Sequence, residues 1–175
     1  ESWSEAVPFA RLKVKLKREI IAFRREGVDP IGAPAPLVDP PTLKRWLDAG
    51  LDVNGRPVVL LDTRNREEVA HGSFEGAVTL PIDDFVQLPD ALEKERHRLA
   101  GATVVSYCTG GIRCEKAAPL LRQLGFGDVR QLDGGILGYF ENVGGAHWAG
   151  ACFVFDDRVA LRPDLSPVGE GGGDV

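Results

Sequence analysis

Residues 103–114 read Thr103-Val104-Val105-Ser106-Tyr107-Cys108-Thr109-Gly110-Gly111-Ile112-Arg113-Cys114. The apolar run at the start is typical of a strand that is buried on both faces, and a helical pattern follows the two glycines. A cysteine between a strand and the N-terminus of a helix lies where backbone N–H groups and the helix dipole converge. Such a setting stabilises the thiolate, which is the reactive form of cysteine. The stretch therefore predicts an α/β fold with a reactive Cys108 at the carboxyl end of a strand.

Strands and helices are expected to alternate on both sides of this stretch. Short apolar strands are predicted at residues 58–61, 78–80, 103–107 and 129–132. Helices are predicted from a cap at Asp39 to a stop at Gly50, and at residues 66–70, 83–87, 89–99, 113–124 and 136–142. This alternation predicts a central, mostly parallel sheet flanked by helices. Asp62 follows one of the strands and is expected at the same sheet edge as Cys108.

The region before residue 39 has a different character. Leu12, Val14 and Leu16 alternate with lysines, the pattern of a half-buried strand, and a stretch rich in Pro and Gly follows. We predict that residues 1–30 end one folding unit, 31–38 are a linker, 39–145 form the main domain, 146–165 are a C-terminal extension, and 166–175 are a disordered tail. The chain has no methionine and begins with Glu1, so we expect it to be a piece of a longer protein.

The composition narrows the class of protein. Of the 175 residues, 43% are hydrophobic and 27% charged, as in ordinary globular proteins, and no apolar run approaches the ~20 residues that span a membrane. No signal-peptide pattern is present, and an odd count of 3 cysteines favours reactive or buried thiols in a reducing compartment. These features predict a cytoplasmic protein that is not bound to a membrane.

The charge is unevenly distributed. The net charge is −5, yet residues 11–25 carry seven basic side chains and one acid. A basic stripe of this kind could contact the phosphates of a nucleic acid. A solvated face of a strand is the alternative. The candidate contact residues are Arg11, Lys13, Lys15, Lys17 and Arg18.

The spacing of the cysteine loop, residues 108–113, indicates its chemistry. Gly110 and Gly111 allow the backbone to curl so that several N–H groups can point at the sulfur. Arg113 can brace this curl or place a positive charge beside an anionic sulfur. Phosphate-cleaving cysteine enzymes use a loop that is one residue longer, since a phosphate dianion needs a wider cradle. The Cys-x4-Arg spacing therefore favours sulfur chemistry over phosphate cleavage.

The sequence shows no sign of a bound cofactor or metal. His71, His97 and His147 are scattered without metal-ligand spacing, and we expect them on the surface or in turns. No glycine cluster has the Gly-x-Gly-x-x-Gly arrangement of a dinucleotide site.

Several motifs resemble those of the rhodanese family. They are the cysteine loop, Leu61-Asp62-Thr63-Arg64, the stretch from His71 to Ala77 followed by Leu80-Pro81, and Leu132-Asp133-Gly134-Gly135 followed by Gly138-Tyr139. The resemblance covers roughly residues 39–142 and implies a rhodanese-like fold for the main domain.

A narrower resemblance covers more of the chain. Residues 107–117 and the stretch Cys152-Phe153-Val154-Phe155-Asp156-Asp157-Arg158-Val159 resemble the rhodanese domain of the bacterial tRNA uridine(34) hydroxylase family. Residues 8–20 resemble the strand that closes the small N-terminal α/β domain of that family, so residues 1–30 would be the end of a domain that is otherwise missing. The resemblance implies oxygen-dependent 5-hydroxylation of the wobble uridine of tRNA, with Cys108 essential and molecular oxygen as co-substrate.

These observations give hypotheses for individual residues. Cys108 would be the reactive thiolate, Arg113 its supporting cation, and Cys114 a resolving thiol. Thr109, Gly110, Gly111 and Ile112 would form the substrate-binding loop, with Asp62 and Arg64 as polar support.

Two other functions stay open. The first is a sulfurtransferase that takes sulfur from thiosulfate or a persulfide and carries it on Cys108. The second is a rhodanese-like binding module without catalytic activity. The sequence leaves the oligomeric state open.

Overall fold

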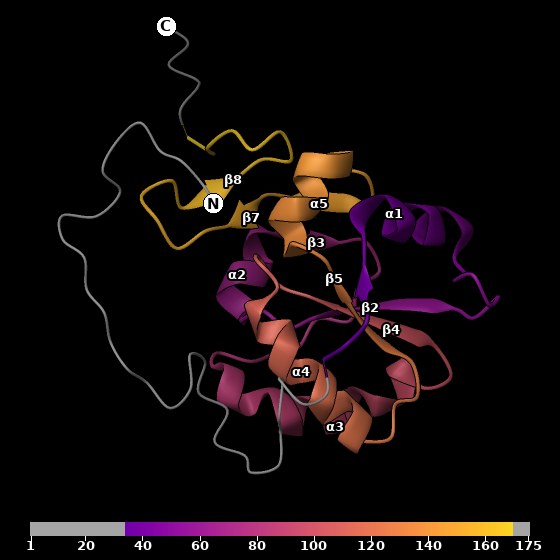
Figure 1. Cartoon of the computed structure of the whole chain (residues 1–175). Helices are drawn as coiled ribbons and strands as arrows, with labels where there is room; N and C mark the ends of the chain where they lie inside the picture. Colours follow the sequence, from indigo (N-terminus) through magenta and orange to yellow (C-terminus); the bar gives the residue numbers. More distant parts are fainter. Residues whose placement is uncertain (1–33, 170–175) are drawn as a thin grey trace, which may run out of the picture.

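A computed structural model describes residues 34–169 of the chain. Four strands form its central sheet, in the order β1-β5-β4-β2 and parallel throughout (Figure 1). They are β1 (Leu37–Val38), β2 (Val58–Asp62), β4 (Thr103–Tyr107) and β5 (Val129–Leu132). The predicted parallel α/β sheet is thereby confirmed, while the predicted strand near residue 14 lies outside the described residues.

Helices cover both faces of the sheet. In Figure 1, α1 (Pro40–Ala49) and α5 (Gly135–Val143) lie on one face, and α3 (Leu88–Leu99) and α4 (Ile112–Gln123) on the other. The short α2 (Arg66–His71) follows β2, and a 3-10 turn, η1 (Phe85–Gln87), precedes α3. Asp39 caps α1 as predicted, since its carboxylate accepts a hydrogen bond of 2.9 Å from the Thr42 N–H.

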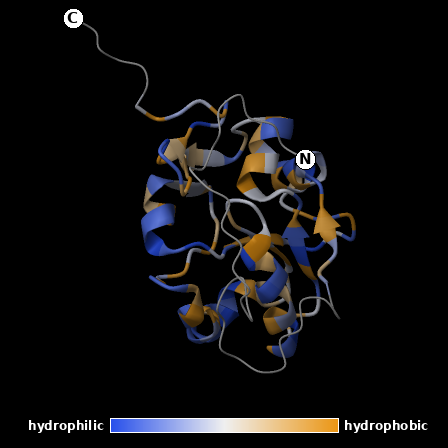
Figure 2. Cartoon of the chain, turned by 60° about the vertical axis from the view of Figure 1, so that its left-hand side comes forward, coloured by the Kyte–Doolittle hydropathy of each residue, from blue (hydrophilic) through white to orange (hydrophobic). Residues whose placement is uncertain are grey.

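Each face of the sheet has its own apolar core. Leu61, Val104 and Val129 point toward α3 and α4, whereas Leu60, Val105 and Leu132 point toward α1 and α5. The alternation follows from the strand geometry, in which successive side chains point to opposite faces. In Figure 2, the helices around the sheet carry both hydrophobic and hydrophilic residues, as expected for helices that have one buried and one exposed side.

Phe74 is the centre of an aromatic cluster on the α5 side. Its ring makes edge-to-face contacts with Tyr107, Tyr139 and Trp148, with centroids 4.9, 4.8 and 5.0 Å away. This geometry is favourable because the positive edge of one ring faces the negative face of the next. The cluster joins β3 (Gly72–Phe74) to β4, α5 and β6 (Trp148–Gly150).

The C-terminal segment, residues 146–168, is part of the fold. Its β6 pairs antiparallel with β3, and its β7 (Cys152–Phe153) pairs with β8 (Ala160–Leu161). Gly72 and Gly150 face each other in the β3–β6 pair, where a Cβ on Gly72 would lie 2.5 Å from the Ala149 carbonyl oxygen. The backbones approach so closely here that only glycine fits.

Three sequence predictions need correction. Leu37 and Val38, assigned to the linker, form β1, because their backbone groups pair with those of β5. Residues 78–80 contribute a single bridge from Val78 to β2 rather than a strand, and the chain then turns away at Pro81. Residues 166–168, predicted to be disordered, are bonded to β8, with a hydrogen bond of 2.9 Å from the Val168 N–H to the Ala160 carbonyl. Within residues 34–169, no helix is long and apolar enough to cross a membrane.

We expect the substitution Phe74→Ala to lower the free energy of unfolding by about 3–5 kcal/mol, because it leaves a cavity among three aromatic rings. Urea denaturation followed by tryptophan fluorescence measures this change. Val53→Ala is the control, since Val53 is 76% exposed and should stay within about 0.5 kcal/mol of the original. A loss below about 1 kcal/mol for Phe74→Ala would contradict the central role of the cluster.

Candidate active site

The cysteine loop curls around the sulfur of Cys108. Cys108 follows β4 directly, and the Gly111 N–H donates a hydrogen bond of 3.1 Å to its Sγ. Gly111 is the N-cap of α4 and has a φ of 89°, a conformation that glycine adopts without strain. The sulfur is thereby placed at the N-terminus of α4, where the helix dipole favours a negative charge.

The N-terminus of α5 fixes the other side of the loop. The Ile136 and Leu137 N–H groups donate hydrogen bonds of 3.0 and 3.2 Å to the carbonyl oxygens of Cys108 and Thr109. A Cβ on Gly135 would lie 2.5 Å from the Cys108 oxygen, so a larger residue would push the loop away. The second glycine motif of the sequence therefore serves to seat the cysteine loop.

The loop lowers the pKa of Cys108. The thiol of Cys114, the guanidinium of Arg113 and the N–H groups of Arg113 and Gly111 together lower this pKa to about 6, although burial opposes them. At neutral pH Cys108 is therefore a thiolate. It exposes only 2% of its surface, at the bottom of a pocket.

Arg113 forms a double ion pair with Glu68 of α2. Its two terminal nitrogens lie 2.5 and 2.6 Å from the two carboxylate oxygens, and the Glu68 side chain is 2% exposed. Burial raises the pKa of Glu68, but Arg113 outweighs it and the pKa lies below its usual value. Glu68 also accepts a hydrogen bond of 3.0 Å from the Asn65 N–H. The pair ties α2 to the first turn of α4.

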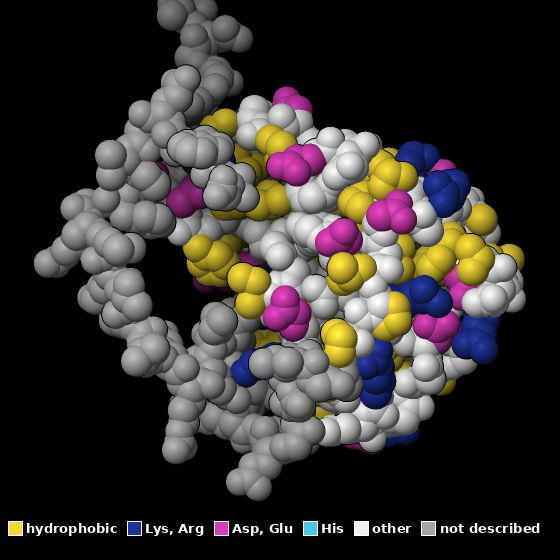
Figure 3. Space-filling model, in the orientation of Figure 1, with side chains coloured by type: hydrophobic (Ala, Val, Ile, Leu, Met, Phe, Trp, Pro, Cys, Tyr) yellow, Lys and Arg dark blue, Asp and Glu magenta, His cyan; other side chains and the backbone are white. Residues whose placement is uncertain are grey.

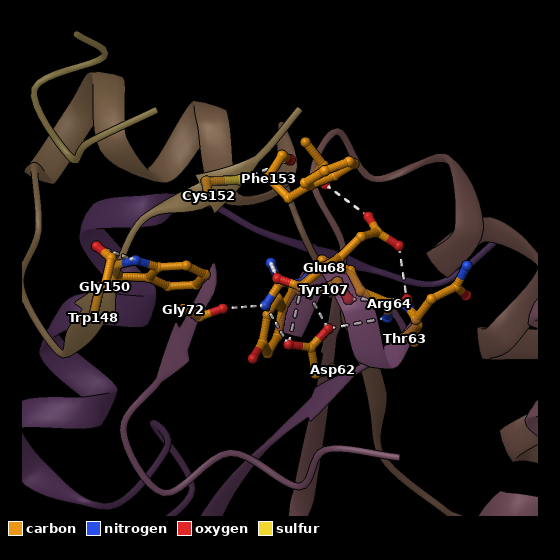
Figure 4. Close-up of polar contacts among 12 residues, drawn as sticks. Asp62, Thr63, Arg64, Glu68, Gly72, Tyr107, Trp148, Gly150, Cys152 and Phe153 are labelled. Atoms are coloured by element: carbon orange, nitrogen blue, oxygen red, sulfur yellow. Dashed lines mark hydrogen bonds and ion pairs between the residues drawn. The ribbon is translucent and has the colours of Figure 1, made fainter. Parts of the chain in front are cut away.

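A second buried ion pair joins Asp62 to Arg64, as Figure 4 shows. The Arg64 guanidinium donates to the Asp62 carboxylate at 2.6 Å and to the Gly72 carbonyl at 2.7 Å. It also lies 5.3 Å from the Trp148 ring. Burial alone would lower the pKa of Arg64, but Asp62 raises it above its ordinary value, so the charge is kept. This pair supports β2, β3 and the C-terminal segment.

The other two cysteines are fully buried. The Sγ of Cys114 lies 3.6 Å from the Thr63 hydroxyl, and burial raises the pKa of this thiol well above its usual value. Burial also raises the pKa of Cys152 to about 11. At neutral pH both are therefore protonated thiols, in contrast to Cys108.

The pocket above Cys108 has a volume of about 520 Å³. Thr109, Gly110, Ile112 and Arg113 of the predicted loop line it. The sequence analysis missed its other lining residues, which are Asn65, Asp83, Asp84, Phe85 and Phe155. The volume lies in the usual range of small-molecule sites.

The structure separates the predicted site residues into two groups. The loop residues lie together with Arg113 around Cys108, whereas Asp62 bonds to Arg64, which also donates to the Gly72 carbonyl. The link from the loop to the sheet edge runs through Glu68, which the sequence analysis did not single out. Its spacing of three from the N-cap Asn65 is a capping-box signal that could have placed it at a helix start.

The histidines are dispersed. His147 bonds to Asp48 at 2.8 Å, and His71 contacts the Phe153 ring. In residues 34–169 no group of three or more His, Cys, Asp or Glu side chains is arranged to hold a metal ion.

Comparison with known proteins identifies the class and then the family. The family model of the rhodanese-like domain matches residues 40–142. The solution structure of a rhodanese-like domain from Anabaena has a TM-score of 0.54 and 23% identity, over 80% of this chain and 90% of that one. The parallel sheet and the cysteine loop thus define a rhodanese-like domain.

Two curated relatives extend the match beyond this domain. A tRNA uridine(34) hydroxylase from Xanthomonas campestris pv. campestris is 59% identical over 170 residues, which are 97% of this chain and 67% of the relative. One from Variovorax paradoxus is 60% identical over 166 residues, 95% of this chain and 63% of the relative. The chain belongs to the tRNA uridine(34) hydroxylase family. It spans about two thirds of the length of these relatives.

The pKa of Cys108 predicts how its reactivity depends on pH. Because only the thiolate reacts, the rate of alkylation by iodoacetamide should rise as the pH increases through about 6 and level off above pH 7.5. Mass spectrometry of the alkylated peptides measures this rate for each cysteine. Cys114 and Cys152 should react only after unfolding, and a midpoint near pH 8.5 for Cys108 would contradict the proposed stabilisation.

Variants of the ion pair between Glu68 and Arg113 separate the effect of Arg113 on the pKa of Cys108 from its effect on the free energy of unfolding. We expect Arg113→Gln to cost about 3 kcal/mol of unfolding free energy, because it leaves the Glu68 carboxylate buried and unpaired. The double variant Glu68→Gln with Arg113→Gln should recover most of this loss. In both variants the pKa of Cys108 should rise above 6, as measured by thiolate absorbance at 240 nm. An unchanged pKa in the double variant would show that Arg113 acts only in folding.

Proposed function

We propose that the protein takes part in the oxygen-dependent 5-hydroxylation of the wobble uridine of tRNA, with Cys108 as its reactive group. The observation that carries this proposal is the Cys108 thiolate at the bottom of an open pocket, in a chain about 60% identical to proteins named tRNA uridine(34) hydroxylase. Molecular oxygen would be the co-substrate, and the cytoplasm, where tRNA is found, the place of action.

The loop residues have distinct roles in this proposal. The N–H groups of Gly111 and Arg113 point at the sulfur, and Thr109, Gly110 and Ile112 form part of the pocket wall. Arg113 stabilises the thiolate through its charge, and Cys114 contributes a thiol next to it. A role for Cys114 in resolving an oxidised Cys108 is part of the same proposal.

Contact with the phosphates of tRNA is proposed for the basic residues 11–18, which lie outside the described residues. On the face of the domain in Figure 3, basic and acidic side chains are interspersed rather than gathered into a patch of one sign. An RNA backbone would find no strongly positive surface there.

Transfer of sulfur through a Cys108 persulfide is the second candidate function. A stabilised thiolate on a turn between a strand and a helix suits this chemistry. The human single-domain sulfurtransferase has a TM-score of 0.50 and 29% identity, over 62% of this chain. On the pocket lining, Asp84 adds a negative charge, whereas the charge of Asp83 is paired with Arg66 at 2.9 Å.

We predict that the full-length gene with Cys108→Ala fails to restore 5-hydroxyuridine at position 34 of tRNA in a strain that lacks the gene. Mass spectrometry of digested tRNA measures the modified nucleoside. The original gene and a Val53→Ala variant, changed at an exposed site, should both restore it. Restoration by the Cys108→Ala gene would overturn the proposal. Thiocyanate formation from thiosulfate and cyanide, tested on the same protein, measures the second candidate function.

A further inference from the structure

Two backbone N–H groups directed at the Cys108 sulfur lie on either side of a single peptide unit. The Gly111 N–H donates to the sulfur at 3.1 Å, and the Arg113 N–H donates to the same atom. The peptide unit between them consists of the Gly111 carbonyl and the Ile112 N–H. Because a peptide unit is planar, its orientation constrains the direction of the N–H group on each side. The hydrogen bonds to the thiolate therefore depend on how this middle peptide is held.

The sequence of the loop does not hold this peptide by itself. Gly110 and Gly111 are adjacent, and Gly111 has a φ of 89°, in the left-handed region. Glycine allows this conformation, but it also allows many others, so a turn with two glycines loses much conformational entropy when it is ordered. A loop that stabilises an anion needs donors that are already in place. The order must come from contacts outside the two glycines.

The side chain of Gln131 supplies such a contact. Its Nε2 donates a hydrogen bond of 3.1 Å to the Gly111 carbonyl, in a buried environment. The Cys114 N–H, from the first turn of α4, donates to the same oxygen at 3.0 Å. A Cβ on Gly111 would lie 3.2 Å from the Gln131 amide nitrogen, so the two groups are closely packed. The middle peptide is thus held from α4 and from the sheet.

Gln131 is itself firmly placed. It lies in β5, where it is the partner of Ser106 in β4 and of Leu37 in β1. Its N–H donates a hydrogen bond of 3.0 Å to the Pro36 carbonyl. Cys108 follows Ser106 by two residues at the end of β4. The same sheet therefore fixes the reactive sulfur and the amide that holds its donors.

The burial of this amide calls for a partner. Gln131 is 8% exposed and lies on the side of the sheet covered by α3 and α4, together with Val129 two residues earlier. Burying an amide costs free energy unless it is hydrogen-bonded, and an apolar side chain of similar size would avoid that cost. The bond to the Gly111 carbonyl offsets it. What the amide adds over an apolar side chain is this contact with the cysteine loop.

We propose that Gln131 is a positioning residue of the reactive site: its amide holds the Gly111 carbonyl and thereby keeps the Gly111 and Arg113 N–H groups directed at the Cys108 sulfur. It acts through the backbone of the loop. As a role in the reaction, this inference rests on the proposed function, in which Cys108 is the reactive group. It applies equally to hydroxylation and to sulfur transfer, since both would use the same thiolate.

The test compares the original chain with the variant Gln131→Met, which has a side chain of similar length without a donor. The rate of alkylation of Cys108 by iodoacetamide is measured against pH. We expect its midpoint to rise from about 6 by about half to one pH unit, because the hydrogen bonds to the thiolate are weakened but not lost. In NMR spectra, the shift of the Gly111 amide proton on titration of Cys108 should become smaller.

Val129→Ala is the matched control. Val129 is 2% exposed on the same face of the same strand, so its truncation lowers stability without removing a contact to the loop. Its midpoint should stay at about 6. Urea denaturation of each variant measures the loss of stability, and Gln131→Ala repeats the test with a smaller side chain. An unchanged midpoint in both Gln131 variants, or an equal rise in Val129→Ala, would overturn the positioning role.

This measurement can fail independently of the proposed function, because it involves no tRNA. An unchanged midpoint in the Gln131 variants would remove the role of Gln131 and leave the hydroxylation proposal as it stands. Restoration of 5-hydroxyuridine by the Cys108→Ala gene would overturn the hydroxylation proposal, while a raised midpoint in Gln131→Met would still show that Gln131 positions the donors of the thiolate.

Discussion

The buried carboxylate of Glu68 connects the reactive loop to the rest of the domain. It faces the Arg113 guanidinium with both oxygens and accepts the N–H of the residue that caps α2. A carboxylate with almost no contact with water is tolerated only when its charge and its lone pairs are satisfied. α2, the cysteine loop and the first turn of α4 are therefore fixed relative to one another by one desolvated group. The precise direction of the Cys108 sulfur depends on this arrangement.

The electrostatics of the site have two parts that act at different distances. Close to the sulfur, backbone N–H groups, the helix N-terminus and Arg113 favour the thiolate. On the rest of the pocket lining, Asp84 adds a negative charge and Asp83 is paired with Arg66 at 2.9 Å. A stabilised thiolate at the bottom of a pocket is therefore the chemical feature that the structure adds to the similarity with proteins named tRNA uridine(34) hydroxylase.

The C-terminal segment completes the domain beyond the family match, which ends at residue 142. Trp148 packs against the buried Arg64 guanidinium (Figure 4), and β6 pairs with β3 as an antiparallel partner. The same segment supplies Phe155, which lines the pocket together with residues of the cysteine loop. Structural support and part of the pocket wall are therefore provided by one stretch of chain. A boundary drawn at residue 145 would remove both.

The local pattern of the sequence determined the parallel sheet, the flanking helices and the position of Cys108 on its turn. Apolar strands such as 58–61 and 103–107, the caps at Asp39 and Gly50, and the glycines of the loop act over a few residues, so they can be read directly. Contacts between distant residues were decided only by the tertiary structure. Glu68 and Arg113 are 45 positions apart, and Phe155 and Cys108, which line the same pocket, are 47 positions apart. In the sequence, Leu37 and Val38 have the character of linker residues, and they form a strand only because they pair with β5 in the folded domain. The reason is physical: desolvation, ion pairing and pocket shape depend on the neighbours that folding supplies, which no short window of sequence contains.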